Sequence, residues 1–61
     1  MTPAQLRDAR EKMNLEPKHL AEILHCTRSF ITQMERGTKK IPWTTKLVIE
    51  AMMSGWRPKG W

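Results

Sequence analysis

Residues that start and stop helices divide the 61-residue chain into short segments, and this division constrains the fold more than any other feature. Thr2, Pro3 and Gln5 form the capping-box pattern that begins a helix. Pro17 suits the first turn of a second helix, and Thr27 suits the N-cap of a third. No stretch alternates apolar and polar residues as a half-buried strand would. The pattern predicts a compact all-α domain of four, or at most five, helices.

Residues that tolerate a left-handed backbone, or whose φ angle is fixed as in proline, occupy the expected helix ends. Asn14 and Gly37 suit left-handed stops, His25 lies where the chain must turn, and Ile41-Pro42 leads into a fourth helix. Apolar positions at helical spacing give each segment one face for the core. We expect these faces to be Leu6, Ala9 and Met13; Leu20, Ala21 and Leu24; Ile31 and Met34; and Leu47, Val48, Ala51 and Met52.

The size and composition favour a small cytoplasmic protein. A chain this short buries only about 60% of its unfolded surface, so the helices must pack closely or find a partner. Cys26 is the only cysteine, which excludes an internal disulfide and suits a reducing compartment. No apolar run approaches a membrane span, and the first ten residues lack the pattern of a signal peptide. We expect a complete intracellular chain with one domain, residues 1–54, and an irregular tail, residues 55–61.

Positive charge is concentrated in the second half of the chain. Residues 1–27 contain four basic and four acidic side chains, whereas residues 28–61 contain seven basic and two acidic ones, so the net charge of +5 arises after residue 27. A basic asymmetry of this kind favours a polyanionic partner such as nucleic acid. Small soluble proteins can also be basic without such a partner.

The segment 28–36 separates its side chains into two sides when it is projected as a helix. Ile31, Met34 and Glu35 fall on one side. The opposite side carries neither an acid nor a large aliphatic residue, although exposed helices usually mix charges of both signs. A helix-turn-helix typically has two helices joined by three or four residues, and its second helix presents a polar outward face of this kind. The outward residues are Arg28, Ser29, Thr32, Gln33 and Arg36.

The outward side chains suit the major groove of double-stranded DNA. Arg28 can bond guanine, Gln33 can bond adenine, and the methyl group of Thr32 can meet that of thymine. We therefore expect base contacts from Arg28, Ser29, Thr32 and Gln33. The candidate phosphate contacts are Thr27 at the helix start, Arg36, and the loop lysines Lys39 and Lys40. Trp43 is a further candidate, which would lie either against the sugar-phosphate backbone or in the core.

The stretch "QLRDAREKMNLEPKHLAEILHCTRSFITQMERG" resembles the helix-turn-helix of the Xre/Cro-CI class, which includes the lambdoid phage repressors. The resemblance covers residues 5–52. It is carried by Leu6, Arg10, Leu20-Ala21, Leu24, Ile31, Met34 and the sequence Glu35-Arg36-Gly37. It implies a repressor-like fold with the helix-turn-helix at about residues 17–36, and base contacts from Arg28, Ser29 and Gln33. It also implies an ion pair between Arg10 and Glu35, which would neutralise a carboxylate on the apolar side.

Two positions depart from the pattern of this class. Pro17 stands where the class usually has a glutamine that contacts phosphate, and we expect Lys18 to replace that contact. His25 stands where the class usually has glycine, and histidine tolerates the left-handed conformation that the turn requires.

Catalytic and metal-binding functions find little support in the residues. His19, His25 and Cys26 do not have the spacing of a structural zinc site. No nucleophile and base are placed together, and the chain is too short to enclose a pocket. We expect no enzymatic activity, no metal, no cofactor and no small-molecule substrate.

The end of the fourth helix has more apolar surface than a monomer of this size can cover. Met53 and Trp56 extend past the expected core, with Trp61 nearby. Because members of the class commonly dimerise through the C-terminal part, we expect a homodimer using Met53 and Trp56. The alternative is a protein-interaction module, such as an antitoxin, that binds a different protein through Met53, Trp56 and Trp61.

These observations predict a sequence-specific transcriptional regulator, most simply a repressor or autoregulator that occupies a palindromic operator as a homodimer. Half-sites about one helical turn apart would match its two-fold symmetry. The resemblance places such a protein in a bacterium or a phage-infected cell. The stretch "IPWTTKLVIEAM" is weakly similar to small regulators associated with anti-CRISPR operons.

Overall fold

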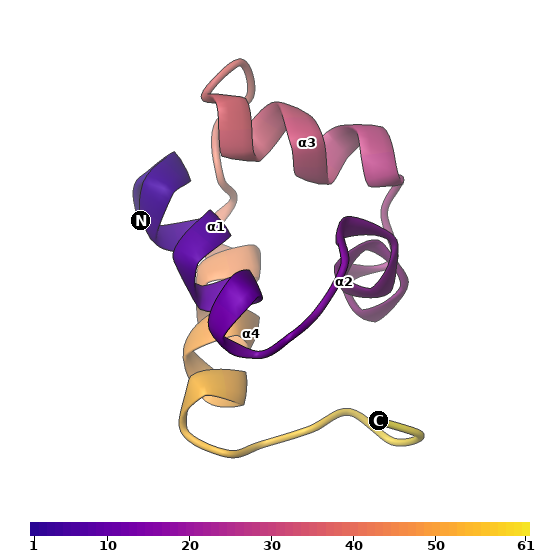
Figure 1. Cartoon of the computed structure of the whole chain (residues 1–61). Coiled ribbons are helices and arrows are strands. Elements are labelled where there is room, and N and C mark those ends of the chain that lie inside the picture. The colour runs from indigo at the N-terminus through magenta and orange to yellow at the C-terminus, as the bar shows by residue number, and fades with distance from the viewer.

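The computed structural model describes all 61 residues and contains four helices and no strand. The helices are α1 (Pro3–Lys12), α2 (Pro17–Leu24), α3 (Arg28–Arg36) and α4 (Trp43–Met53). In Figure 1, α3 lies above the other helices, with α1 and α4 on one side and α2 on the other. The prediction of an all-α domain is confirmed, with four helices rather than five. None of these helices combines the length and the apolarity needed to cross a bilayer.

The first helix begins with the predicted capping box. The backbone N–H of Gln5 donates to Oγ1 of Thr2 at 3.1 Å, and the backbone N–H of Thr2 donates to Oε1 of Gln5 at 2.9 Å. Two N–H groups at the helix start are thereby satisfied. Asn14, just after the helix, has the predicted left-handed backbone, with φ of 58°. The bounds of α1 thus follow from local sequence.

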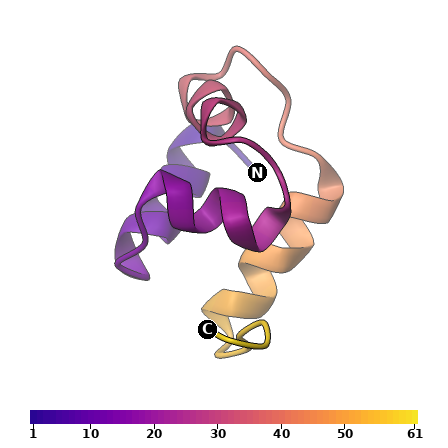
Figure 2. The same ribbon diagram turned by 90° about the vertical axis from the view of Figure 1, so that its right-hand side faces the viewer.

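A turn of three residues joins α2 to α3. His25 ends α2 in the left-handed region, with φ of 55°, and the N–H of Cys26 donates to the carbonyl of Ala21 at 2.9 Å. Thr27 then begins α3, because its Oγ1 accepts the backbone N–H of Phe30 at 3.1 Å. In Figure 1, α3 runs across the view and α2 is seen almost end-on, whereas Figure 2 shows the reverse. The turn therefore sets the two helices at a steep angle.

All four helices contribute to one hydrophobic core. Leu6, Leu20, Ile31 and Met34 have no exposed surface, and Ile49 of α4 is 1% exposed. Ala9 and Ala21 complete the cluster, while Met13, Leu24, Cys26, Phe30 and Ile41 pack against it from its edge. The expected core faces of the first three helices are confirmed, with Met13 and Leu24 only partly buried.

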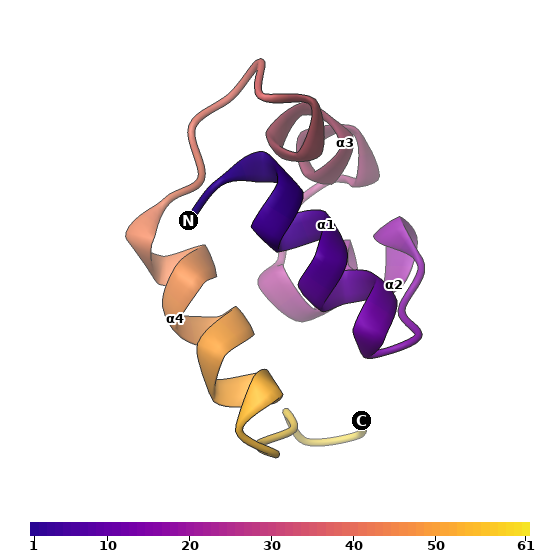
Figure 3. The ribbon, with the colours of Figure 1, turned by 60° about the vertical axis from the view of Figure 1, so that its left-hand side comes forward.

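The expected core face of α4 is wrong except for Met52. The buried residues are Thr45, Ile49 and Met52, while Leu47 is 53% exposed and Val48 and Ala51 are half-buried. The continuous apolar run Leu47-Val48-Ile49 surrounds the helix and does not define one face. Figure 3 shows α4 packed beside α1, and this contact selects the side that carries Ile49. The core face of α4 is therefore set by its tertiary packing and not by its apolar pattern.

Gly37 ends α3 and directs the following loop away from the helix. Its φ of 83° lies in the left-handed region, where glycine carries no steric penalty. Both the backbone N–H and the hydroxyl of Thr38 donate to the carbonyl of Gln33, at 3.0 and 3.1 Å. These bonds fix the start of the loop, so Lys39 and Lys40 follow the C-terminus of α3 as exposed side chains.

Residues 55–61 form no helix, as expected, but they fold back toward α2. Nη1 of Arg57 donates to the carbonyls of Met52 and Trp56, at 2.7 and 2.8 Å. The indole ring of Trp61 meets the His19 ring edge-to-face, with 5.7 Å between the ring centres. Figures 1 and 3 show the end of the chain below α2.

Candidate nucleic-acid interface

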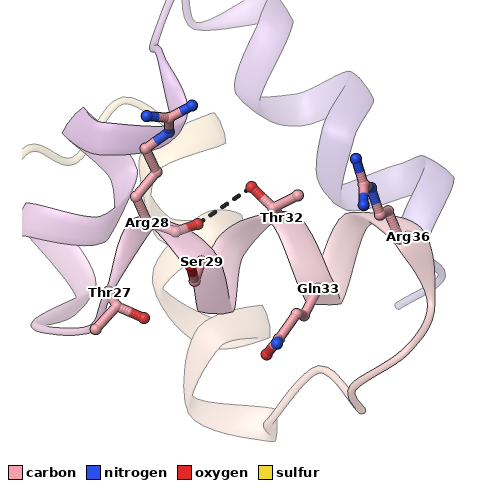
Figure 4. Close-up of a pocket in the computed structure, with 6 residues that line it drawn as sticks. All are labelled: Thr27, Arg28, Ser29, Thr32, Gln33 and Arg36. Carbon is pink, nitrogen blue, oxygen red and sulfur yellow. Dashed lines mark hydrogen bonds between the residues drawn. The ribbon is translucent and has the colours of Figure 1, made fainter.

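Six residues of the third helix and its N-cap line a shallow depression on the outside of the molecule (Figure 4). None of them is hydrophobic. All four residues predicted to contact bases are among them, together with two of the predicted phosphate contacts. This surface, called the α3 face below, consists of Thr27, Arg28, Ser29, Thr32, Gln33 and Arg36.

The opposite side of α3 fixes the helix to the body of the protein. Ile31 and Met34 are completely buried between α3 and the helices beneath it. Burying a side chain of this size stabilises the fold by about 1.5 to 3 kcal/mol. The α3 face is therefore presented on a helix whose position is held by the core.

The ion pair that the resemblance implied is present. Nε of Arg10 donates to Oε2 of Glu35 at 2.7 Å, and Nη2 of Arg10 donates to Oε1 of Glu35 at 3.2 Å. Nη1 of Arg10 donates to the carbonyl of Leu15 at 2.8 Å. The two side chains are only 13% and 12% exposed. The hydrogen bonds to Glu35, with its negative charge, raise the pKa of Arg10 against the opposing effect of burial.

Arg28 and Arg36 differ from the other arginines because neither has a partner within the chain. Arg7 pairs with Glu11, Arg10 pairs with Glu35, and Arg57 bonds to backbone carbonyls. Arg28 and Arg36 are exposed, and their guanidinium groups make no ion pair or hydrogen bond. Two unpaired guanidinium groups on one face, with no acid among them, attract an anionic partner.

Some of the uncharged side chains of the α3 face form hydrogen bonds within the chain, and others form none. The hydroxyl of Thr32 donates to the carbonyl of Arg28 at 3.2 Å, as the dashed line in Figure 4 marks. Thr27 accepts the N–H of Phe30, which leaves its own hydroxyl hydrogen available to an anion. The side chains of Ser29 and Gln33 make no hydrogen bond to any other group of the chain.

A second shallow depression adjoins the N-terminal end of α3. It is lined by Glu16, Pro17 and Lys18 of the α2 N-terminus and by Arg28, which it shares with the α3 face. Nζ of Lys18 lies 3.5 Å from Oε2 of Glu16, and both side chains are more than 60% exposed. Lys18 is therefore next to the α3 face, as a phosphate contact requires. Sequence reasoning missed Glu16, whose carboxylate already neutralises part of this lysine's charge.

The remaining predicted phosphate contacts lie beyond the C-terminal end of α3. Lys39 and Lys40 line a separate depression with Met1 and Pro3. Trp43 is 72% exposed at the start of α4, so the interpretation of this side chain as a core residue is wrong. Cationic side chains therefore flank both ends of the α3 face.

A shallow, open apolar depression lies on the outward side of α4. Its lining consists of Leu47, Val48, Ala51, Ser54 and Trp56, and this surface is called the α4 groove below. Trp56 is 51% exposed. Sequence reasoning missed Leu47 and Val48 here because it assigned them to the core.

The structure does not gather the predicted dimer residues on one surface. Met53, which is 50% exposed, is absent from the α4 groove. It follows Ala51 by two positions and so leaves the helix about 160° away from it. Trp61 lies against His19 instead.

The histidine and cysteine side chains form no cluster with acids that could hold a metal ion. Cys26 packs against the edge of the core, and burial raises the pKa of its thiol. A thiol in such an environment is held in its unreactive form.

Comparison with protein-family models, curated proteins and solved structures found no match for this chain.

Proposed function

We propose that this protein binds double-stranded DNA sequence-specifically, with α3 in the major groove. The observation that carries the proposal is the α3 face itself. It presents the unpaired guanidinium groups of Arg28 and Arg36 together with the unengaged side chains of Ser29 and Gln33. Exposed polar surface is common, but a helix face with free donors, no acid and no apolar side chain has the chemistry of a base-contacting surface.

The arrangement of α2 and α3 supports this proposal. The major groove is about 12 Å wide and admits one α-helix. Because α2 crosses α3 at a steep angle, it can rest against the DNA backbone while α3 enters the groove. The ion pair between Arg10 and Glu35 holds the C-terminal end of α3 on α1, on the side away from the DNA.

Phosphate contacts would flank the base contacts at both ends of α3. Thr27 and Lys18 lie near its N-terminal end, and Arg36, Lys39 and Lys40 lie near its C-terminal end or just beyond it. Backbone contacts on either side of a recognition helix fix its register without supplying sequence information. Trp43, exposed after the loop, would extend this contact along the sugar-phosphate backbone.

The biological role that fits best is a repressor or autoregulator in the cytoplasm of a bacterium or a phage-infected cell. The resemblance to the Xre/Cro-CI class supports this part of the proposal. Repression would come from occupying a palindromic operator.

We further propose that the chain acts as a homodimer through α4. The α4 groove supports an interface that includes Trp56 and extends to Leu47 and Val48, whereas Met53 lies on another side of α4 and would fall outside this interface. The same groove also favours the second candidate function, an antitoxin-like module that binds a different protein. The oligomeric state separates the two, because only the homodimer forms in a solution of the purified chain alone.

Titration of the protein with duplex DNA at two salt concentrations tests the proposal. Contacts to several phosphates predict that the affinity falls steeply as salt rises. Arg36→Ala should weaken binding to all sequences, whereas Lys59→Ala removes an equal charge from the tail and should have a smaller effect. Binding that is insensitive to salt, or equal effects of the two variants, would contradict a DNA contact at the α3 face.

A further inference from the structure

Three residues of the α3 face, Arg28, Gln33 and Arg36, carry side chains that can form a pair of hydrogen bonds to one base, and none of the three has a partner within the chain. An arginine bonds O6 and N7 of guanine, and a glutamine bonds N6 and N7 of adenine. The guanidinium of Arg28 and the carboxamide of Gln33 make no hydrogen bond within the chain. All their donors and acceptors are therefore available to a base.

The other side chains of the α3 face are less able to select a base. Ser29 bears a hydroxyl, which can bond to any of the bases. The Thr32 hydroxyl is turned back onto the carbonyl of Arg28. Arg36 is the last residue of α3, and base contacts come mainly from the N-terminal part of a recognition helix. Sequence preference therefore falls mainly to Arg28 and Gln33.

The positions of these two residues on α3 set the distance between the bases that they can reach. Gln33 follows Arg28 by five positions, which is roughly 7 to 8 Å along a helix. Base pairs follow one another at roughly 3.4 Å. The two contacted base pairs should therefore lie two or three steps apart.

Arg28 and Gln33 also leave α3 on different sides of its axis. Their positions are about 140° apart around the helix. In Figure 4 the Arg28 side chain extends to one side of α3, beside α2, and the Gln33 side chain extends to the other. With α3 lying along the major groove, side chains that diverge toward its two walls would approach base edges of opposite strands.

We infer that each half-site contains a guanine contacted by Arg28 and an adenine contacted by Gln33, on opposite strands and two or three base pairs apart. On a single strand, such a half-site shows a guanine and a thymine at that spacing. The inference rests on the proposed DNA-binding function and adds the chemical identity of the target.

Selection of bound sites from a random duplex library tests the inference. The full chain, Arg28→Ala, Gln33→Ala and the control Lys59→Ala are each used for selection, and discrimination at each base pair is then measured with defined duplexes. Arg28→Ala should lose its preference at the G·C pair only, and Gln33→Ala at the A·T pair only. A bidentate contact predicts that discrimination falls from about 5- to 150-fold to near unity. Lys59→Ala should select the same sequence as the unsubstituted chain.

Different failures have different meanings in this experiment. A motif whose G·C pair is unaffected by Arg28→Ala, with uniformly weaker binding, would make Arg28 a phosphate contact and overturn the inference. Guanine and adenine on one strand, or at another spacing, would overturn it as well. If the unsubstituted chain selects no motif at all, the proposed sequence-specific DNA binding itself is wrong. Far-ultraviolet circular dichroism verifies that each variant is folded, which is expected because both substituted side chains are exposed.

Discussion

Arg10 of α1 holds Glu35 of α3 through two hydrogen bonds, of 2.7 and 3.2 Å, at a site where both side chains are almost buried. A third hydrogen bond ties Arg10 to the carbonyl of Leu15, in the connection to α2. One guanidinium group thus links three parts of the domain. The carboxylate of Glu35 belongs to the interior of the protein, although it lies one residue before the exposed Arg36.

Replacing Glu35 by glutamine should destabilise the protein substantially. The substitution leaves the Arg10 guanidinium nearly buried without its counter-charge, which costs about 2 to 4 kcal/mol in the free energy of unfolding. Urea denaturation of the two proteins measures this difference. Glu11→Gln is the matched control, because its ion pair with Arg7 is largely exposed and should contribute about 0.5 kcal/mol or less. Equal losses in the two variants would contradict the structural role of Glu35.

Replacing His25 by glycine should stabilise the protein. His25 adopts φ of 55°, and a left-handed conformation costs a residue with a Cβ atom about 1 kcal/mol or more. Glycine removes that cost, although its flexible unfolded state offsets part of the gain. We expect the free energy of unfolding to rise by about 0.5 kcal/mol for His25→Gly and to fall for His25→Val. A large loss for the glycine variant would show that the imidazole stabilises the turn.

Cys26 should react slowly with alkylating reagents while the protein is folded. Burial raises the pKa of its thiol, so the reactive thiolate is scarcer at pH 8 than in an unfolded chain. We expect iodoacetamide to modify the folded protein several-fold more slowly than the urea-unfolded protein, with the rate still rising with pH above 8. Mass spectrometry follows the reaction. Equal rates in the two states would mean that Cys26 is not protected by the core.

Leu47→Ser should weaken the proposed homodimer more than Met53→Ser. Both side chains are about half exposed, but only Leu47 lines the α4 groove. Sedimentation equilibrium at micromolar concentrations compares the two variants with the unsubstituted chain. Dissociation by Met53→Ser alone would place the interface on the other side of α4. A monomeric unsubstituted chain would contradict the homodimer altogether.

Local signals made much of this fold predictable. The capping box at Thr2, the cap at Thr27 and the stop at Gly37 act through neighbouring backbone groups, and all three lie where the sequence indicates. The apolar face of α3 is equally clear because Ile31 and Met34 lie on one side of a helix whose other side is polar. For the same reason the α3 face could be listed from the sequence: it is the side that the core does not use.

Other features depend on contacts between helices, which the sequence of a single helix does not indicate. The core face of α4 was assigned wrongly because apolar residues surround that helix and only its packing against α1 selects Ile49. The pairing of Arg10 with Glu35 came from a family resemblance, since two charged residues 25 positions apart carry no local signal. The contact between Trp61 and His19 likewise depends on how the tail folds back.

Contact between the α3 face and DNA can be tested residue by residue by nuclear magnetic resonance. Duplex DNA, first of random sequence and then carrying a selected site, is added to isotope-labelled protein, and the amide shifts are followed. We expect the largest changes on residues 27–36 and on Lys39 and Lys40, with small changes in the α4 groove. Changes confined to α4 and the tail, or none at saturating DNA, would contradict this contact.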